Sequence, residues 1–419
     1  MEKLKPYPKY KPVNLPWLKE IPVHWEMLRA KKLFSIFDER SKDGDESLLS
    51  VSSNYGVVNR NSIDVTMFKA ESYVGYKLCY PQDLVVNSLW AWAYGLGFSE
   101  QKGIISTAYS VYRLRNCQNT YYLYYNYLLR SSAYHWEFRV RSKGIWKSRY
   151  QLHDSSFMNI PIILPPPDEQ KKIVAFLDEK TAKIDKYIEA KSKEIELLKE
   201  QKNAEISNAV TRGLNPNTKF KPVNLPWLKE IPAHWECKKI RAYFSERRKK
   251  VSDQDFAPLS VTKQGVVPQL ETACKTNDGD NRKLVLSGDF VINSRSDRKG
   301  SSGISYIDGS VSLINIVLEP RNIHDTYINY LLRSNDFIEE FYRNGRGLVA
   351  DLWTTRYQEM RNIFIPIPQL DEQKKIVAFL DDKTEKYTKA ISAIQRKIDL
   401  LKEYKTRLIS DAVTGKIRV

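Results

Sequence analysis

Cysteine is scarce in this chain, and long apolar runs are absent. The 419 residues include four cysteines, Cys79, Cys117, Cys237 and Cys274, and no two of them form a CxxC pair. This spacing argues against a disulfide framework and against a zinc site, and it favours a reducing compartment. No apolar run approaches the roughly 18 residues of a membrane span, and the Lys- and Pro-rich start lacks the apolar core of a signal peptide. We therefore expect a soluble, cytoplasmic protein that does not bind a membrane.

The motifs of several enzyme classes are also missing. A DNA methyltransferase that modifies an amino group would need an Asn-Pro-Pro-Tyr type loop and a Gly-rich cofactor turn, and the sequence has neither. Gly95 and Gly97 do not continue into GxGxxG, and no P-loop or HExxH occurs. We assign no catalytic residue, no metal ligand and no cofactor to this chain.

Two long strings occur twice in the chain. KPVNLPWLKEIP stands unchanged at residues 11–22 and 221–232, and DEQKKIVAFLD at residues 168–178 and 371–381. The protein is therefore an internal duplication, in which two shared frames enclose two variable inserts. The copies stay alignable through the inserts at an offset that falls from 210 to 206 and then to 203 residues. Each frame carries a histidine beside Trp and Glu, His24 and His234, and we interpret both as packing residues.

The positive charge is concentrated on the inserts. The net charge is +17, yet residues 168–213 carry ten acidic and ten basic side chains, and residues 371–419 carry eight acidic and twelve basic ones. The other +13 lies in residues 1–167 and 214–370. A positive field on two similar domains is typical of a polyanion binder, and DNA is the leading candidate.

Two stretches without Gly or Pro, residues 168–212 and 371–414, predict long helices. Asp168 and Asp371 are expected to N-cap them, with Gly213 and Gly415 at their ends. The second stretch has a heptad seam of Leu380, Tyr387, Ile391, Ile394, Ile398, Leu401, Leu408 and Ala412. The first stretch has a weaker seam in the same register, because Lys191, Lys202 and Glu205 interrupt it. Two seams of equal length predict that the helices pack on each other; the alternative is that each lies on its own domain.

Between the frames, short β-rich runs with turn signals alternate with helical runs, which predicts a mixed sheet-and-helix insert. The expected fold class is α+β: two tandem mixed α/β domains separated by two long antiparallel coiled-coil helices, with a pseudo-twofold internal repeat. The expected parts are residues 1–167 (first domain with its frame), 168–213 (central helix), 214–370 (second domain) and 371–419 (C-terminal helix).

The candidate binding residues lie where the aligned copies differ. Residues 89–96 read LWAWAYGL, whereas residues 295–302 read RSDRKGSS. Two domains with one task and different targets would differ in such a loop, although ordinary loop drift is the alternative. The candidates are Asn87, Ser88, Trp90, Trp92 and Tyr94 in the first copy and Ser294, Arg295, Arg298, Lys299 and Ser301 in the second. Arginine can bond O6 and N7 of guanine, and aromatic rings can pack on backbone or on thymine methyl groups.

A second candidate cluster is rich in basic residues and lies late in each insert. It comprises Arg139, Arg141, Lys143, Lys147 and Arg149 in the first copy, interleaved with aromatic residues, and more sparsely Arg343, Arg346 and Arg356 in the second. Such residues suit phosphate and base contacts. The alternative is a solvated basic surface.

Tandem variable domains, each closed by a long helix that opens with Glu-Gln and an IV.FLD run, resemble the specificity subunit of type I restriction-modification enzymes. The resemblance spans the whole chain and rests on IPVHWE at 21–26, IPAHWE at 231–236, both DEQKKIVAFLD strings, NSLWAWAYGLG at 87–97 and GIISTAY at 103–109. The family usually has Gly before the frame Trp and Pro before Glu-Gln, where this chain has His24 and Asp168.

This resemblance implies a noncatalytic subunit whose inserts are target recognition domains, each reading one half of a bipartite sequence in double-stranded DNA. It implies that the helices set the spacer and dock two methyltransferase subunits. S-adenosylmethionine and ATP with Mg would then belong to partner subunits, and whether two restriction/translocase subunits join is left open. The alternatives are a self-contained DNA modification enzyme and an orphan DNA-binding regulatory protein.

Overall fold

The computed structural model describes residues 5–63, 70–115, 121–144, 150–272, 279–347 and 353–419. It divides into two compact units, the first with residues 1–191 and 396–419 and the second with residues 192–395. Each unit contains one insert, the start of one long helix and the end of the other. The four-part domain division expected from sequence stays a prediction, because the compact units cut across both long helices.

The first unit is built on a four-stranded antiparallel sheet in the order β4-β11-β8-β9. Its strands are β4 (Phe34–Phe37), β11 (Tyr109–Leu114), β8 (Leu84–Asn87) and β9 (Leu96–Phe98). Strand pairs β1–β2, β3–β12, β5–β6 and β7–β10 surround it, formed by β1 (Tyr10–Leu15), β2 (Leu18–Pro22), β3 (Glu26–Arg29), β5 (Leu49–Ser52), β6 (Gly56–Asn59), β7 (Lys77–Cys79), β10 (Gly103–Ile105) and β12 (Pro161–Leu164). The short helices are α1 (Ala30–Leu33), η1 (Arg60–Ser62), η2 (Ala91–Ala93), α2 (Tyr122–Leu129), α3 (Ser132–Arg141) and α4 (Asp154–Met158).

The second unit repeats this arrangement, and its four-stranded sheet has the equivalent order β16-β24-β21-β22. Its strands are β13 (Phe220–Pro222), β14 (Glu230–Pro232), β15 (Glu236–Lys239), β16 (Phe244–Glu246), β17 (Lys250–Val251), β18 (Leu259–Thr262), β19 (Gly265–Pro268), β20 (Arg282–Val285), β21 (Phe290–Asn293), β22 (Ser302–Ile304), β23 (Gly309–Ser312), β24 (Asn315–Pro320) and β25 (Phe364–Ile367). Its short helices are η4 (Ile240–Ala242), η5 (Ser296–Arg298), α6 (Asp325–Leu332), α7 (Asn335–Arg343) and α8 (Tyr357–Met360). The fold class expected from the sequence is confirmed at the level of two mixed domains with two long helices.

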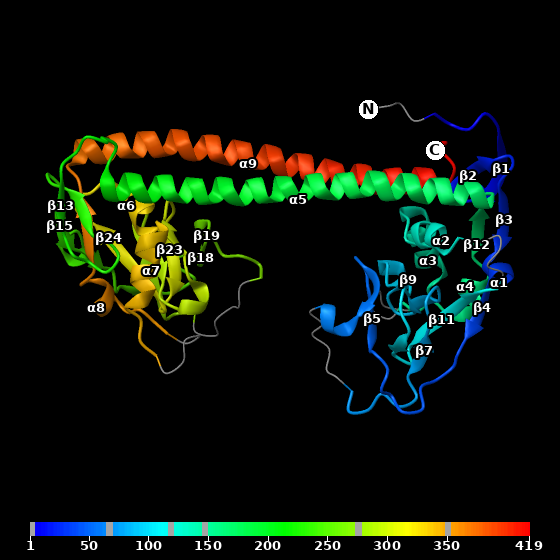
Figure 1. Cartoon of the computed structure of the whole chain (residues 1–419). Helices are drawn as coiled ribbons and strands as arrows, with labels where there is room; N and C mark the ends of the chain where they lie inside the picture. The colour runs from blue at the N-terminus through cyan, green and yellow to red at the C-terminus, as the bar shows by residue number, and fades with distance from the viewer. Residues whose placement is uncertain (1–4, 64–69, 116–120, 145–149, 273–278, 348–352) are drawn as a thin grey trace. The chain divides into compact units, whose positions relative to one another are not determined.

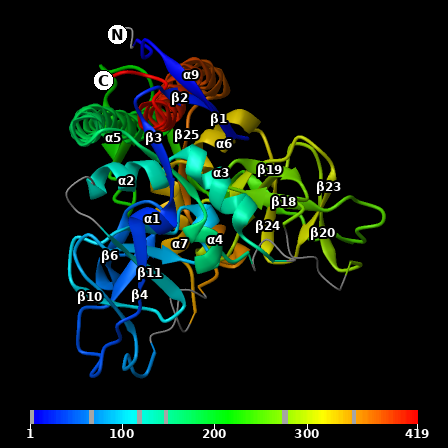
Figure 2. The same cartoon turned by 90° about the vertical axis from the view of Figure 1, so that its right-hand side faces the viewer.

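Each four-stranded sheet buries both faces because successive strand residues point to opposite sides. In β8, Leu84 and Val86 belong to the large core with the helices, while Val85 packs in a small core with Leu49 and Cys79. The alternation recurs in β21 of the second unit. Figures 1 and 2 show α2 between the start of the green long helix and the sheet of the first unit. The sheet is thus a rigid platform whose loops can carry side chains for binding.

The long helices are α5 (Pro167–Arg212) and α9 (Leu370–Val413). In the first unit the start of α5 lies beside the end of α9, and Lys405 Nζ of α9 lies 2.6 Å from an Asp185 carboxylate oxygen of α5. In the second unit the start of α9 lies beside the end of α5, where the Tyr387 hydroxyl donates to Glu205 at 3.0 Å. The antiparallel pairing is therefore confirmed within each unit. Glu205, which interrupts the first seam, and Lys405 of α9 thus each bond to the opposite helix.

The expected N-caps are wrong by two residues. Both helices begin one residue before the aspartates, and the carbonyls of Pro166 and Gln369 accept the first helical bonds, at 2.9 and 3.0 Å from each carbonyl. Asp168 and Asp371 instead lie in the first turn, where a negative charge favours the helix dipole. The prolines before Asp168 can occupy the first helical turn because a helix has no partner for its first N–H groups.

The Glu-Gln pair at each helix start holds the helix on its own insert. Glu169 accepts hydrogen bonds from His24 Nε2 and Trp25 Nε1, each at 2.7 Å, and from the Tyr7 hydroxyl at 3.1 Å. Gln170 accepts from the backbone N–H of Tyr121 at 2.9 Å, immediately before α2. His24 therefore contributes to the contact between the helix and the frame.

The same contacts recur in the second unit. Glu372 accepts from His234 Nε2 at 2.9 Å and from Trp235 Nε1 at 3.0 Å, and Gln373 accepts from the N–H of His324 at 2.9 Å. His234 therefore makes the same contact as His24. The repeated HWE and DEQ segments thus contact each other and form one joint between frame and helix, present once in each unit.

Candidate nucleic-acid interface

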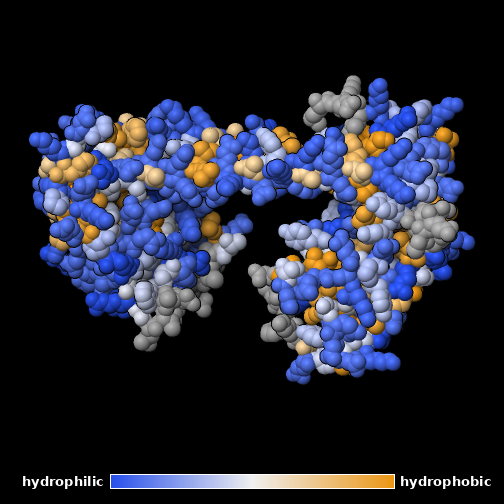
Figure 3. Space-filling model, viewed as in Figure 1, coloured by the Kyte–Doolittle hydropathy of each residue, from blue (hydrophilic) through white to orange (hydrophobic). Residues whose placement is uncertain are grey.

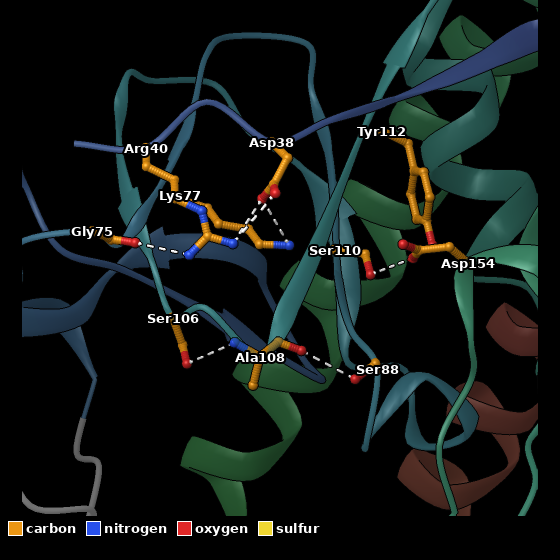
Figure 4. A network of polar contacts seen from close by, with 10 residues as sticks. All are labelled: Asp38, Arg40, Gly75, Lys77, Ser88, Ser106, Ala108, Ser110, Tyr112 and Asp154. Atoms are coloured by element: carbon orange, nitrogen blue, oxygen red, sulfur yellow. Dashed lines mark hydrogen bonds and ion pairs between the residues drawn. The ribbon is translucent and has the colours of Figure 1, made fainter. Parts of the chain in front are cut away.

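The loop after β8 in the first unit is held by its first two residues. Asn87 Oδ1 accepts a bond from the N–H of Leu89 at 3.2 Å, and the Ser88 hydroxyl donates to the carbonyl of Ala108 at 3.1 Å (Figure 4). Ser88 is only 4% exposed. Both candidate residues therefore shape the loop, and their contact with DNA stays a prediction.

The aromatic residues of this loop form a stacked group. The rings of Trp90 and Trp92 lie 5.7 Å apart at 20°, and those of Tyr94 and His135 lie 4.6 Å apart at 11°. Trp92 Nε1 donates to the carbonyl of Leu89 at 2.9 Å. Burial lowers the pKa of the His135 ring, which favours its neutral form. Trp90 is 54% exposed and is the ring of this group best placed to meet a ligand.

The equivalent loop of the second unit presents charge instead. Arg295 makes two 2.9 Å bonds to Asp297, and Lys299 Nζ lies 2.6 Å from a Glu339 oxygen. The side chain of Arg298 is 68% exposed, and its closest contact with Asp297 is 3.9 Å. Arg298 is therefore freer than Arg295 to bind a ligand.

Two further candidates in the second loop are buried. Ser294 and Ser301 are 3% and 6% exposed, and the Ser294 hydroxyl donates to the carbonyl of Ile314 at 2.6 Å. This bond corresponds to that between Ser88 and Ala108 in the first unit. Ser88 and Ser294 therefore fix the start of each loop in the same way, whereas the exposed positions that follow them differ.

One left-handed backbone position shows that the two loops share a conformation. Tyr94 has φ of 63°, and Gly300, which is 206 residues further on, has φ of 81°. Glycine adopts this conformation without strain, whereas a tyrosine does so at a cost of roughly 1 kcal/mol or more. The stacking of Tyr94 on His135 offsets part of that cost, since an aromatic pair contributes about 0.5–1.5 kcal/mol. The two loops therefore present different chemistry from the same backbone turn.

The second candidate cluster is partly committed to internal ion pairs. Arg141 lies 2.8 Å from the buried Glu137, and Arg343 makes bonds of 2.8 and 2.9 Å to the buried Glu340. Removing either arginine would leave a buried carboxylate unpaired, so both have a structural role. These ion pairs were not expected from the sequence, because helices α3 and α7, which bring the charges together, were not predicted.

The other members of this cluster are exposed or outside the described residues. Arg139 and Lys143 are exposed, and the Arg346 side chain is 84% exposed although it lies 3.6 Å from Glu359. Lys147 and Arg149 lie outside the described residues. Arg346 and Arg295 both form backbone bridges with Thr354, so the structure brings Arg346 to the η5 loop. In the first unit η2 packs against α3, which carries Arg139.

The second unit has a basic groove of about 520 Å³ that was not expected from the sequence. Its lining includes Arg248, Lys250, Lys283 and Arg356, together with Ser294 at the start of the η5 loop. The run RRKK at residues 247–250 was the available signal. Lys283 and Arg356 are far from it in sequence, and only the fold brings them to the same groove.

No metal centre accompanies these surfaces in the part of the chain that the structure describes. There, no group of three or more His, Cys, Asp or Glu side chains is arranged to hold a metal ion. Nor does any described helix have both the length and the apolar character to cross a membrane. Figure 3 shows mainly hydrophilic residues on the faces of both units that are turned to the viewer.

Part of the chain matches a known class of domain. Residues 22–197 match the family model described as the type I restriction modification DNA specificity domain. The chain is similar to the type I restriction enzyme MjaVIII specificity subunit of Methanocaldococcus jannaschii, with 25% identity over 350 residues that cover 77% of this chain and 76% of the relative. It is also similar to the MjaX specificity subunit of that organism, with 24% identity over 96% of this chain and 95% of the relative.

Solved structures share the fold. A chain from a type I R-M system, described for its complex assembly and conformational transition, has a TM-score of 0.68 at 16% identity and covers 95% of this chain and 99% of its own length. The HsdS subunit of Thermoanaerobacter tengcongensis has a TM-score of 0.51 at 16% identity, covering 95% and 98%. The resemblance to the specificity subunit of type I restriction-modification systems is confirmed.

Proposed function

We propose that this chain gives a type I restriction-modification enzyme its DNA specificity, with each unit reading one half of a bipartite sequence in double-stranded DNA. The observation that carries this proposal is the pair of loops at η2 and η5. They start from equivalent buried serines and share a left-handed residue, yet one exposes Trp90 and the other Arg298. A common scaffold with different exposed groups suits one task performed on two different base sequences.

The long helices have a separate role in this proposal. As two antiparallel helices of 46 and 44 residues, they set the spacer between the half-sites and offer docking surfaces to two methyltransferase subunits. The chain itself is noncatalytic, and S-adenosylmethionine, ATP and Mg²⁺ bind to the partner subunits. The purified chain alone should transfer no methyl group to DNA, and methyl transfer by the chain alone would contradict the proposal.

Replacing Arg298 by Ala tests the reading role of the η5 loop. If this guanidinium bonds O6 and N7 of a guanine, discrimination at one base of one half-site should fall by about 1–3 kcal/mol. Selection from a random DNA library by the assembled complex measures the preference at every position. Trp90→Ala is the matched control, because it removes the exposed residue of the other loop and should alter only the other half-site. An unaltered preference at all positions in both variants would remove these loops from the reading surface.

A further inference from the structure

Equivalent grooves of the two units carry opposite charge. Strand register fixes the equivalence: Arg40 bridges Lys77 in the first unit, and Lys250 pairs with Lys283 in the second. The offsets are 210 and 206 residues, as in the sequence alignment. Asp38 of the first unit therefore occupies the position of Arg248 in the second.

The other wall of the groove can be matched in the same way. The N–H of Leu152 donates to the carbonyl of Ser88 at 2.9 Å, and the N–H of Thr355 donates to the carbonyl of Ser294 at 2.9 Å. The next residues are then equivalent, so His153 corresponds to Arg356.

Seven positions of this region can be compared directly. In the first unit these positions are Ile36, Asp38, Glu39, Arg40, Lys77, His153 and Asp154, which include two cations and three anions. The second unit has five cations and one anion, at Glu246, Arg248, Lys249, Lys250, Lys283, Arg356 and Tyr357. One fold position thus changes from slightly acidic to strongly basic.

The charged groups of this region in the first unit are largely bonded within the unit. Asp38 lies 3.3 Å from Arg40 and 3.2 Å from Lys77, as Figure 4 shows. Asp154 accepts bonds of 2.6 Å from the hydroxyls of both Ser110 and Tyr112. This region therefore has little capacity to attract a polyanion.

In the second unit, this region has more cationic side chains than acidic partners. Glu246 is paired with Arg248 at 2.6 Å and with Lys283 at 3.2 Å, so its charge is satisfied. Lys250 and Arg356 are both exposed, and neither forms an ion pair with a described residue. A cation that is exposed without an acidic partner can bind an external anion without first breaking an internal contact.

We propose that this basic groove, defined by Arg248, Lys250, Lys283 and Arg356, binds the DNA sugar-phosphate backbone beside the second half-site, and that the first unit has no equivalent contact. The inference rests on the proposed function. DNA is favoured over an acidic protein because the groove adjoins the reading loop: Ser294 lines it, and Thr354 of its lining bridges Arg295. Phosphate contacts from such a position would fix the register of the η5 loop on the duplex. The second unit then supplies most of the salt-dependent affinity.

The double variant Lys250→Ala, Arg356→Ala of the full chain tests this proposal. Both side chains are exposed and unpaired among described residues, so the fold should be preserved. The probe is a random-sequence duplex, because phosphate binding does not depend on base sequence. Fluorescence anisotropy across a salt series gives the slope of log affinity against log salt, and each lost phosphate contact should lower its magnitude by about 0.9.

Arg40→Ala is the matched control, since it removes one cation at the position equivalent to Lys250. It should leave the slope unchanged. A slope that is equal in the unaltered chain and the double variant, while the unaltered chain binds steeply, overturns the groove assignment alone. The groove assignment is also overturned if Arg40→Ala lowers the slope as much as Lys250→Ala does. A double variant that keeps its slope but no longer captures a methyltransferase subunit overturns it as well. Absence of duplex binding by the unaltered chain in complex with its partners would instead overturn the proposed function.

Discussion

Glu169 provides the most direct test of the joint between each long helix and its insert. Replacing Glu169 by Ala removes the acceptor of three bonds, from Trp25 Nε1, His24 Nε2 and the Tyr7 hydroxyl. The equivalent Glu372 accepts from only two described side chains, those of His234 and Trp235. The two substitutions should therefore differ in their effect on the free energy of unfolding.

The expected magnitude follows from burial. Trp25 is 0% exposed, so its indole N–H would lose its partner without access to water, which costs about 1–3 kcal/mol. The bond from Tyr7 to a charged acceptor adds about 1 kcal/mol, and the exposed His24 adds little. We expect a loss of about 3 kcal/mol for Glu169→Ala and about 2 kcal/mol for Glu372→Ala.

Urea unfolding of the full chain measures these losses, and hydrogen exchange of β1–β3 against β13–β15 assigns them to one unit. Glu196→Ala is the control, because Glu196 lies on the same long helix and its 2.8 Å contact with Lys199 is exposed. It should change stability by no more than about 0.5 kcal/mol. The reasoning fails if Glu169→Ala falls within that margin, or if Glu372→Ala is the more costly change.

Three further outcomes are expected. Gly415→Ala should destabilise the protein more than Gly213→Ala does, as measured by thermal unfolding. Both glycines have positive φ, but a Cβ at Gly415 would lie 2.5 Å from Pro22 Cδ, whereas a Cβ at Gly213 would have its nearest atom 3.2 Å away. Burial alone would raise the pKa of Glu169, but hydrogen bonds from Trp25 and His24 hold it below its usual value; its stabilising effect is therefore present above about pH 4.3 and lost as the pH falls through the lowered pKa. A Glu169→Gln variant should show a smaller acid-induced loss of stability in pH-dependent unfolding. Inserting four residues at facing positions of α5 and α9 adds about 6 Å to each helix. Selection from a random DNA library should then find a wider gap between the half-sites and unchanged half-site sequences. A changed half-site with an unchanged gap would refute a spacer role.

The long helices could be predicted closely from the sequence. Their expected ends differ from the observed ends by at most one residue, because prolines precede each helix and a glycine of positive φ follows it. Runs free of Gly and Pro leave little choice of conformation over more than 40 residues. The caps were less predictable, since several polar or proline residues stand together at each start.

The candidate interface was predictable only in part. The position of the variable loops followed from comparing the two copies, because identical flanking residues mark the start of each loop. The exposure of particular side chains did not follow, since Ser88 and Ser294 are buried by bonds to residues 20 positions away. The basic groove depends on strand pairing between Lys250 and Lys283, which a sequence pattern does not specify.

A buried aspartate occupies equivalent positions in the two units, but its arginine partner comes from a different segment in each. Asp83 is paired at 2.8 Å with Arg113 of β11, whereas the equivalent Asp289 is paired at 2.7 Å with Arg247, which follows β16. Both members of each pair lie within a single insert. An insert that is exchanged as a whole between the repeated frames would therefore keep its buried ion pair. A crossover inside the insert would leave a buried aspartate without its arginine or place two arginines beside each other. Exchange of a whole insert at the repeated strings therefore conserves these buried ion pairs, whereas exchange within an insert does not.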